Sequence, residues 1–153
     1  MSQMPDVEQG YAPPAVRQFS VFLDNRVGKL LELLQAVEER PDLNLAAISV
    51  VDSSDYAVVR MIFSNADAAR HLLSRCRFTF SETSVVVVAL AENQSVSSIC
   101  LALLAAEVNI RFVYPVFMSH GDSTVALSAD DTQFAGQVLL RKRFRLLGEE
   151  DFC

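Results

Sequence analysis

The apolar residues of this chain repeat one order of predicted elements in its two halves, and this repeat limits the folds open to it. Each half begins with a strand-like run and continues with a helix-like segment, whose apolar residues recur at i, i+3, i+4 and i+7. Two further strands, a second helix and a last strand follow. A βαββαβ unit with right-handed crossovers places both helices on one face of a four-stranded antiparallel sheet. The sequence therefore predicts an α+β fold made of two ferredoxin-like modules.

The first half supplies the clearer set of elements. We expect strands at 16–23, 44–51 and 56–63, a helix at 29–39 capped by Asp24 or Asn25, and a second helix capped by Ser64 or Asn65. The apolar run that follows, 78–90, is longer than a typical strand of about five or six residues. The sequence therefore predicts a break near Glu82 and Thr83, where the first module ends and the second begins.

The second half repeats the order with a weaker pattern. Its expected elements are a strand at 85–90, a helix with Val96, Ile99 and Leu103 on one face, strands at 109–117 and 124–128, a helix from Asp130 or Asp131 to about 142, and a last strand at 144–147. The predicted organisation is an extended, proline-containing leader (1–15), a first module (16–82) and a second module (83–153).

The sheet of such a module has two surfaces that need cover: the face without helices and the edge strand. The second strand of each unit lies at a sheet edge, where Pro115 is tolerated because an edge strand can lack an amide proton. An apolar edge such as 45–51 tends to pair with another strand. We expect the two modules to pair edge to edge, or two chains to pair as a homodimer.

Composition limits the classes of partner that the protein is expected to bind. Hydrophobic residues make up 51% of the chain, which suits a folded core, and a net charge of −6 with a pI of about 4.8 disfavours nucleic acid. The start of the sequence lacks the pattern of a secretory signal, and no run approaches about 18 apolar residues. A cytoplasmic protein without a membrane partner is expected.

Residue types that carry catalysis or bind metals are sparse and scattered. The three cysteines stand far apart without a CxxC pair, and the two histidines have no ligand-like spacing, so disulfides and a metal site are not expected. Cys76 and Cys100 are expected on apolar helix faces. No nucleophile motif or phosphate-binding glycine loop occurs. These observations predict no cofactor, no catalytic residue and no enzyme activity.

The loop DNRVGKL at 24–30, the leucine-rich helix after it and the strand NLAAISVV together resemble the ACT family. The second half, through AENQSVSSICLALLAAEVNIRFVYPVF, resembles it more weakly, and the likeness covers 16–147. The resemblance implies allosteric, regulatory binding of an amino acid or similar metabolite at an interface between modules. Small chains of this kind resemble the regulatory subunit of acetolactate synthase, which implies a biosynthetic enzyme as a partner.

A helix N-terminus offers unpaired amide donors, so a ligand carboxylate is expected beside Val27 and Gly28, and an ammonium group at Asp24 or Asn25. A tight turn at Gly28 and helix capping by Asp24 or Asn25 are the simpler structural interpretations of the same residues. The corresponding loop of the second module lacks glycine, which questions an equivalent site there. The candidate ligand-binding residues are Asp24, Asn25, Arg26, Val27, Gly28, Leu30, Ile48, Ser49, Val50, Asn93, Gln94 and Tyr114.

Three functions fit these observations. The favoured one is a non-catalytic sensor or regulatory subunit whose two modules bind an amino acid. The alternatives are a protein-interaction module without a ligand, and a small enzyme with a pocket at a dimer interface. An enzyme would need an ionisable group with a perturbed pKa in that pocket, and the sequence offers none beyond the loop residues.

Overall fold

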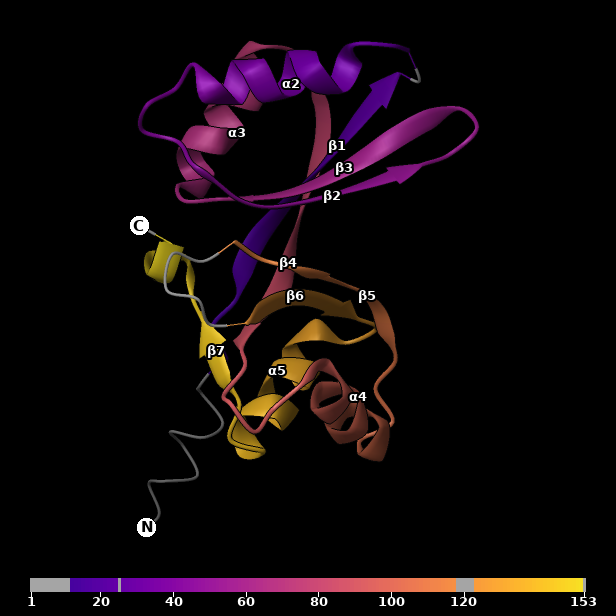
Figure 1. Ribbon diagram of the computed structural model, residues 1–153, viewed down its shortest axis with the longest axis vertical. Helices are drawn as coiled ribbons and strands as arrows, with labels where there is room; N and C mark the ends of the chain where they lie inside the picture. The colour runs from indigo at the N-terminus through magenta and orange to yellow at the C-terminus, as the bar shows by residue number, and fades with distance from the viewer. Residues whose placement is uncertain (1–11, 25, 118–122, 153) are drawn as a thin grey trace.

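The computed structural model of the protein describes residues 12–24, 26–117 and 123–152. Figure 1 shows the two halves of the chain stacked along the long axis of the molecule. The first half contains β1 (Val16–Asp24), α2 (Lys29–Glu38), β2 (Leu45–Asp52), β3 (Tyr56–Phe63), α3 (Ala66–Arg75) and the start of β4 (Thr79–Ala89). The second contains the rest of β4, then α4 (Val96–Ala105), β5 (Ile110–Pro115), β6 (Thr124–Ala129), α5 (Thr132–Arg141), β7 (Arg145–Leu147) and the 3₁₀ turn η1 (Glu149–Phe152).

The predicted α+β fold of two βαββαβ modules is confirmed. Two predicted helix caps are also confirmed, since the side chains of Asn65 and Asp131 accept hydrogen bonds from the first turns of α3 and α5. The expected cap of α2 is wrong. That helix begins after Gly28, because a turn closed by the bond from the Lys29 amide to the Arg26 carbonyl precedes it, and Gly28 supplies the left-handed residue within this turn.

The expected break near Glu82 and Thr83 is absent, because β4 runs without interruption for 11 residues. Up to Val85 it pairs with β1, and from Val86 it pairs with β6 and β7. One strand therefore completes the sheet of the first module and opens that of the second. The resulting strand order is β2-β3-β1-β4-β6-β5, with β7 also paired to β4. The leader predicted at 1–15 lies outside the described residues up to position 11.

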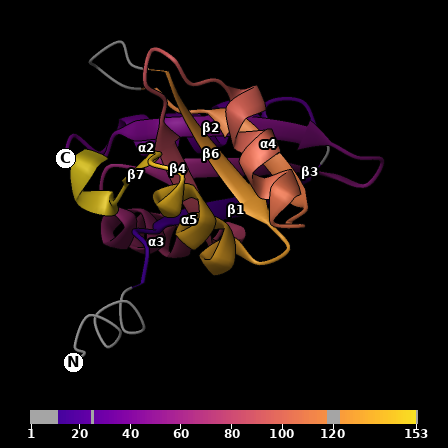
Figure 2. The same cartoon turned by 90° about the horizontal axis from the view of Figure 1, so that it is seen from below.

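Alternate residues of β4 face opposite sides, as in any strand. Phe80 packs in the core beneath α2 and α3, and Val86 and Val88 pack in the core beneath α4 and α5. Val85 and Val87 point the other way, into an apolar layer between the two sheets. Figure 1 shows the helices of each module on the outer side of its sheet, and Figure 2 shows α4 and α5 together on one of these sides.

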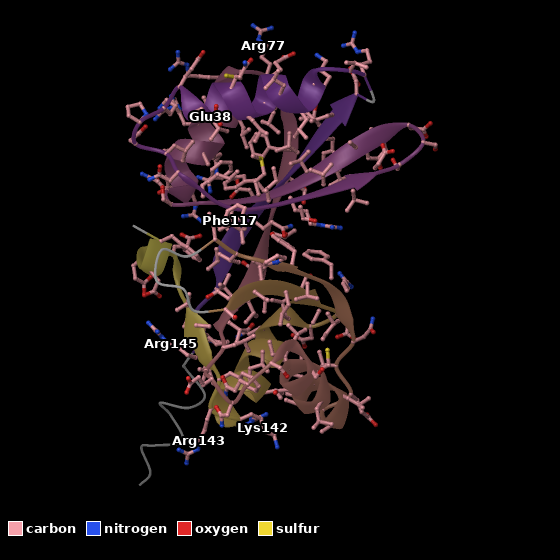
Figure 3. The ribbon with its side chains drawn as sticks, in the orientation of Figure 1. Glu38, Arg77, Phe117, Lys142, Arg143 and Arg145 are labelled. Carbon is pink, nitrogen blue, oxygen red and sulfur yellow. The ribbon has the colours of Figure 1, made fainter. Side chains whose placement is uncertain are left out.

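The helix-free faces of the two modules thus cover one another. The central layer between them consists of Val16, Ala46, Ala47, Ile62, Val85, Val87, Ala89, Tyr114, Val116, Ala126 and Leu147. The expected edge-to-edge pairing of the modules is therefore wrong within one chain: β2 and β5 lie at opposite ends of the strand order. They meet only across the layer, where the Phe117 amide donates to the Ala46 carbonyl at 2.7 Å, and Figure 3 places Phe117 between the modules. Pairing of these edges between two chains remains a prediction.

Two cysteines were predicted on apolar helix faces, and this prediction is wrong. Cys76 and Cys100 are exposed rather than packed on apolar faces, because Cys76 lies at the C-terminal cap of α3 and Cys100 faces away from the core under α4.

None of the helices within the described ranges has the length and apolar composition that a membrane span requires. Within the same residues, His, Cys, Asp and Glu side chains form no group of three or more that would ligate a metal.

Arg17 ties the first strand to the end of the chain. Its Nε and Nη2 atoms donate to the Glu149 carboxylate at 2.9 and 2.8 Å, its backbone amide donates to the same group at 2.8 Å, and Nη1 donates to Asp67 at 3.0 Å. The Arg17 guanidinium holds the pKa of the Glu149 carboxyl below its usual range, chiefly by hydrogen bonding. The pair therefore fastens η1, after β7, to β1.

We predict that halves separated between Glu82 and Ser84 do not fold independently, because each would expose its side of the central layer and the first half would lose part of β4. Circular dichroism during heating tests this on each half and on their mixture. Broad, non-cooperative melting of each half is expected. A half that melts cooperatively at the temperature of the whole chain would contradict the shared-strand architecture.

We predict that Glu149→Gln lowers the free energy of unfolding at pH 7 by about 1 kcal/mol, the scale of a well-formed, partly exposed pair. A carboxyl with a lowered pKa in the folded state stabilises the protein above its unfolded pKa, and this contribution disappears as pH falls through the folded value. The difference between wild type and variant should therefore shrink on acidification. Urea titrations at pH 7 and below pH 4 measure it, and a constant difference would refute the assignment.

Candidate functional site

The loop before α2 is shaped by a left-handed glycine. Gly28 has φ of 91°, and a Cβ added to it would meet no atom within 4 Å, so the glycine serves the backbone turn and borders open space. No described side chain caps α2, whereas Asn65, Ser95 and Asp131 cap the other helices. The first turn of α2 therefore presents backbone amides that no described side chain accepts from.

The neighbouring loop residues are exposed. Asp24 at the end of β1 pairs with Arg26 at 3.4 Å, and both side chains are largely in solvent. Val27 is fully exposed, while Leu30 is half-buried against the core of the first module. Asn25 lies outside the described residues. The loop thus combines an exposed apolar side chain, an ion pair and an open helix N-terminus.

The structure does not bring the predicted β2 residues to this loop within one chain. Val50 is level with Val21 through β3, and Val21 lies three residues before the end of β1. Ile48 packs against the helix-side core, and Ser49 stands opposite Arg60. The predicted interface site therefore requires a second copy of the chain to place these β2 residues beside Gly28.

The loop of the second module borders a groove of about 490 Å³ at the start of α4. Asn93 is exposed, and Gln94 binds the chain itself, accepting from the Ala91 amide at 2.9 Å. Ser95 and Ser98 form a reciprocal capping box at the same helix start. Local hydrogen bonds therefore occupy the side chains of Gln94 and Ser95, which agrees with the doubt that the missing glycine of this loop raised.

The Tyr114 side chain packs in the central layer between the modules. It is 6% exposed in the central layer, and its hydroxyl donates to Gln18 Oε1 at 2.6 Å. Burial raises the pKa of the Tyr114 hydroxyl, while the nearby Arg60 charge acts in the opposite direction. Gln18 is also buried, and its Nε2 donates to the Ser20 hydroxyl at 3.3 Å. This bridge holds the sheets of the two modules together through a satisfied buried polar pair.

Beyond the Gln18–Tyr114 bridge the sheets separate around a cleft of about 520 Å³, which sequence reasoning missed. Its walls come from β1, β3 and β4 of the first module and from β5, β6 and the start of α5 of the second. Most of its lining is polar or charged. No motif marks these residues in the sequence, since they are brought together only by the face-to-face packing of the modules.

A comparison with known protein families finds a match over residues 14–153 to the family described as "ACT domain pair". The chain belongs to the ACT domain pair family. This match covers nearly all of the described residues, and it confirms the ACT resemblance inferred from the loop at 24–30.

Solved structures also resemble this chain. Protein BT0572 from Bacteroides thetaiotaomicron is 25% identical, with a TM-score of 0.81 over 92% of this chain and 96% of that one. The ligand-free regulatory subunit of aspartate kinase from Thermus thermophilus is 12% identical, with a TM-score of 0.52 over 84% and 93% of the two chains. The latter likeness concerns the fold alone. No curated protein is detectably similar in sequence.

The bridge between the two ACT modules gives a test of how they are held. We predict that Tyr114→Phe lowers the free energy of unfolding by about 1–2 kcal/mol, because the buried Gln18 amide oxygen loses its donor. Tyr56→Phe, at an exposed tyrosine, is the matched control and should change stability little. Urea denaturation measures both variants.

A double variant separates the lost hydrogen bond from lost packing. Replacing both partners by apolar groups, in Gln18→Met with Tyr114→Phe, removes the unpaired oxygen and should be less destabilising than Tyr114→Phe alone. If the double variant loses as much stability as Tyr114→Phe and Gln18→Met lose when measured singly and added together, the two side chains are not specifically paired.

Proposed function

We propose that this ACT domain pair protein is a non-catalytic regulatory or sensor protein that binds an amino acid or a similar small metabolite at the α2 loop. The observation that carries the proposal is the start of α2, where a left-handed Gly28 leaves the helix amides without a described side-chain cap beside open space. Amide donors and the positive end of the helix dipole suit a carboxylate. Asp24 is the proposed acceptor for the ligand's ammonium group.

A homodimer is part of the proposal. Apolar side chains are exposed at the end of the first-module sheet that carries the α2 loop: Val27, Leu31, Val50, Val51 and Tyr56. The edge strand β2 also offers unpaired backbone groups on that side. A second copy that covers this end would bring its own Ile48–Val50 segment toward the loop, where that segment would contact the side chain of the ligand.

The proposed partner is an enzyme of amino-acid biosynthesis, which the ligand-bound dimer would regulate. The regulatory subunit of aspartate kinase from Thermus thermophilus shares the fold of this chain, and this likeness supports a regulatory role without identifying the enzyme. An association with acetolactate synthase remains a prediction. Cytoplasmic location belongs to the same proposal.

We predict that Val27→Asp abolishes amino-acid binding without weakening the fold. The added carboxylate would repel a ligand carboxylate, while an acidic residue near a helix N-terminus is itself favourable. Val27 is fully exposed, so its replacement removes no packing. Val27→Asn is the matched control, because asparagine has nearly the same shape as aspartate and carries no charge. Gly28→Val is a poorer probe, since valine at φ of 91° would strain the loop whatever it binds.

The measurement is a thermal-shift screen against the twenty amino acids, followed by calorimetric titration of those that stabilise the protein. A ligand at 100 times its dissociation constant should add about 2.7 kcal/mol to the stability of wild type and Val27→Asn. Val27→Asp should show no shift and an unchanged melting temperature without ligand. If no amino acid stabilises the wild type, or if Val27→Asp binds as well as Val27→Asn, the proposed site is wrong.

A further inference from the structure

The cleft between the modules has a polar roof, formed by one face of the first-module sheet. Strand register places Ser49 opposite Arg60, Arg60 opposite Ser20, and Ser20 opposite Ser81, so four polar side chains form a row across four strands. All four lie on the helix-free face. On the side of Val16, Ile62 and Val85 this face is covered by the apolar central layer, whose residues belong to both modules. At this row the apolar cover ends and Ser20, Arg60 and Ser81 line the cleft.

The second module supplies the opposite wall. Phe112 and Ser128 are register partners on β5 and β6, and Arg111 and Asp130 line the cleft beside them. The Arg60 guanidinium carbon lies 4.0 Å from the centre of the Phe112 ring. This cation–π contact crosses from one module to the other and holds the planar guanidinium at the cleft. Ligand groups in the cleft would therefore meet both modules.

The charge of the cleft is opposite to that of the whole protein. The chain carries a net charge of −6, yet Arg60 and Arg111 line the cleft against one carboxylate, that of Asp130. Neither arginine forms an ion pair with a described carboxylate. Asp130 accepts from the Asn109 amide at 3.3 Å. The basic residues Lys142, Arg143 and Arg145 lie on the outer part of the second module in Figure 3 and do not line the cleft.

Hydroxyl groups form much of the remaining lining, beside Gln18 and the apolar residues Phe22, Val58 and Ala129. They belong to Ser20, Ser81, Thr83, Ser84, Ser128 and Thr132. Guanidinium groups bind carboxylates and phosphates through two parallel hydrogen bonds, and hydroxyls can donate to the remaining oxygens. A volume of about 520 Å³ falls within the range of small-molecule sites, about 300–1,000 Å³. These groups suit an anion better than an apolar ligand.

We propose that the inter-module cleft is a second ligand site, which binds a small metabolite bearing a carboxylate or phosphate group through Arg60 and Arg111. The site is separate from the α2 loop, so the inference goes beyond the proposed function and does not depend on it. Ser20, Ser81 and Ser128 contact the polar substituents of the ligand. Because the two arginines come from different modules, the bound anion links the modules across the cleft.

Calorimetric titration at low ionic strength tests the proposal with two sets of probes that contain no amino acid: inorganic phosphate and glycerol phosphate, and succinate and citrate. Saturable binding of at least one set is expected, and the set that binds more tightly identifies the anionic group. Arg60→Met retains a chain of similar length over Phe112 but removes the charge, and should weaken binding at least ten-fold. Arg75→Gln, at an exposed arginine in the last turn of α3, should leave binding within two-fold of wild type.

Two further variants keep the test decisive if Arg60→Met folds poorly. Arg111 is exposed, and Arg111→Gln should weaken binding with little effect on the melting temperature. Ser81→Asp adds a carboxylate to an exposed position of the cleft and should abolish binding by repulsion. The α2 loop variant Val27→Asp should bind the anion as wild type does.

Three results would overturn the inference: no saturable binding of either probe set, unchanged affinity in Arg111→Gln and Ser81→Asp, or loss of binding in Val27→Asp with these cleft variants unaffected. The last result would assign the anion to the α2 loop and leave the proposed function intact. Conversely, a finding that the α2 loop binds no amino acid would not affect the assignment of the cleft. The two assignments can therefore fail separately.

Discussion

The whole arrangement depends on β4, a single strand whose hydrogen bonds belong to two sheets. Its residues up to Val85 pair with β1, and those from Val86 pair with β6 and β7. Because side chains alternate along a strand, one set faces both pairs of helices and the other set faces the space between the sheets. Strand twist rotates one sheet relative to the other, so their helix-free faces can close on each other. The two modules therefore share one strand, and for this reason we expect them to fold as one unit.

The layer between the sheets is divided by a buried polar pair. On one side of Gln18 and Tyr114, small and β-branched apolar residues pack closely; on the other, the hydroxyl-rich cleft opens. A buried amide without partners would be costly, so the 2.6 Å bond to Tyr114 and the contact to Ser20 let Gln18 occupy this boundary. The bond also fixes how the two faces align, because it has one favourable geometry. Arg60 over Phe112 adds a second fixed contact across the cleft.

Local chemistry was predictable from the sequence where a single residue decides it. Asn65 and Asp131 cap their helices as expected, since a cap depends only on the residues beside it. The break predicted near Glu82 failed because length was the only argument for it: no glycine or proline interrupts this run, and its serine and threonine residues tolerate a strand. The cleft could not be predicted, because Ser20, Arg60 and Phe112 are brought together by packing between modules, which no local pattern encodes. The candidate loop was found from Gly28, but its ligand role stays a prediction.

The two candidate sites are joined by β1. Ser20 and Phe22 line the cleft from the helix-free face of this strand, Val21 and Leu23 pack in the first-module core, and Asp24 leads into the α2 loop. A ligand bound at the loop and a ligand that links the modules would therefore both restrain the same nine-residue strand. If binding at one site changes the affinity of the other, thermodynamic linkage requires the reverse effect to be equal in free energy. Such coupling through β1 would be lost in a protein with two independent modules. If the proposed regulation exists, the shared β4, which pairs with β1 from Thr79 to Val85, would therefore serve it as well as the fold.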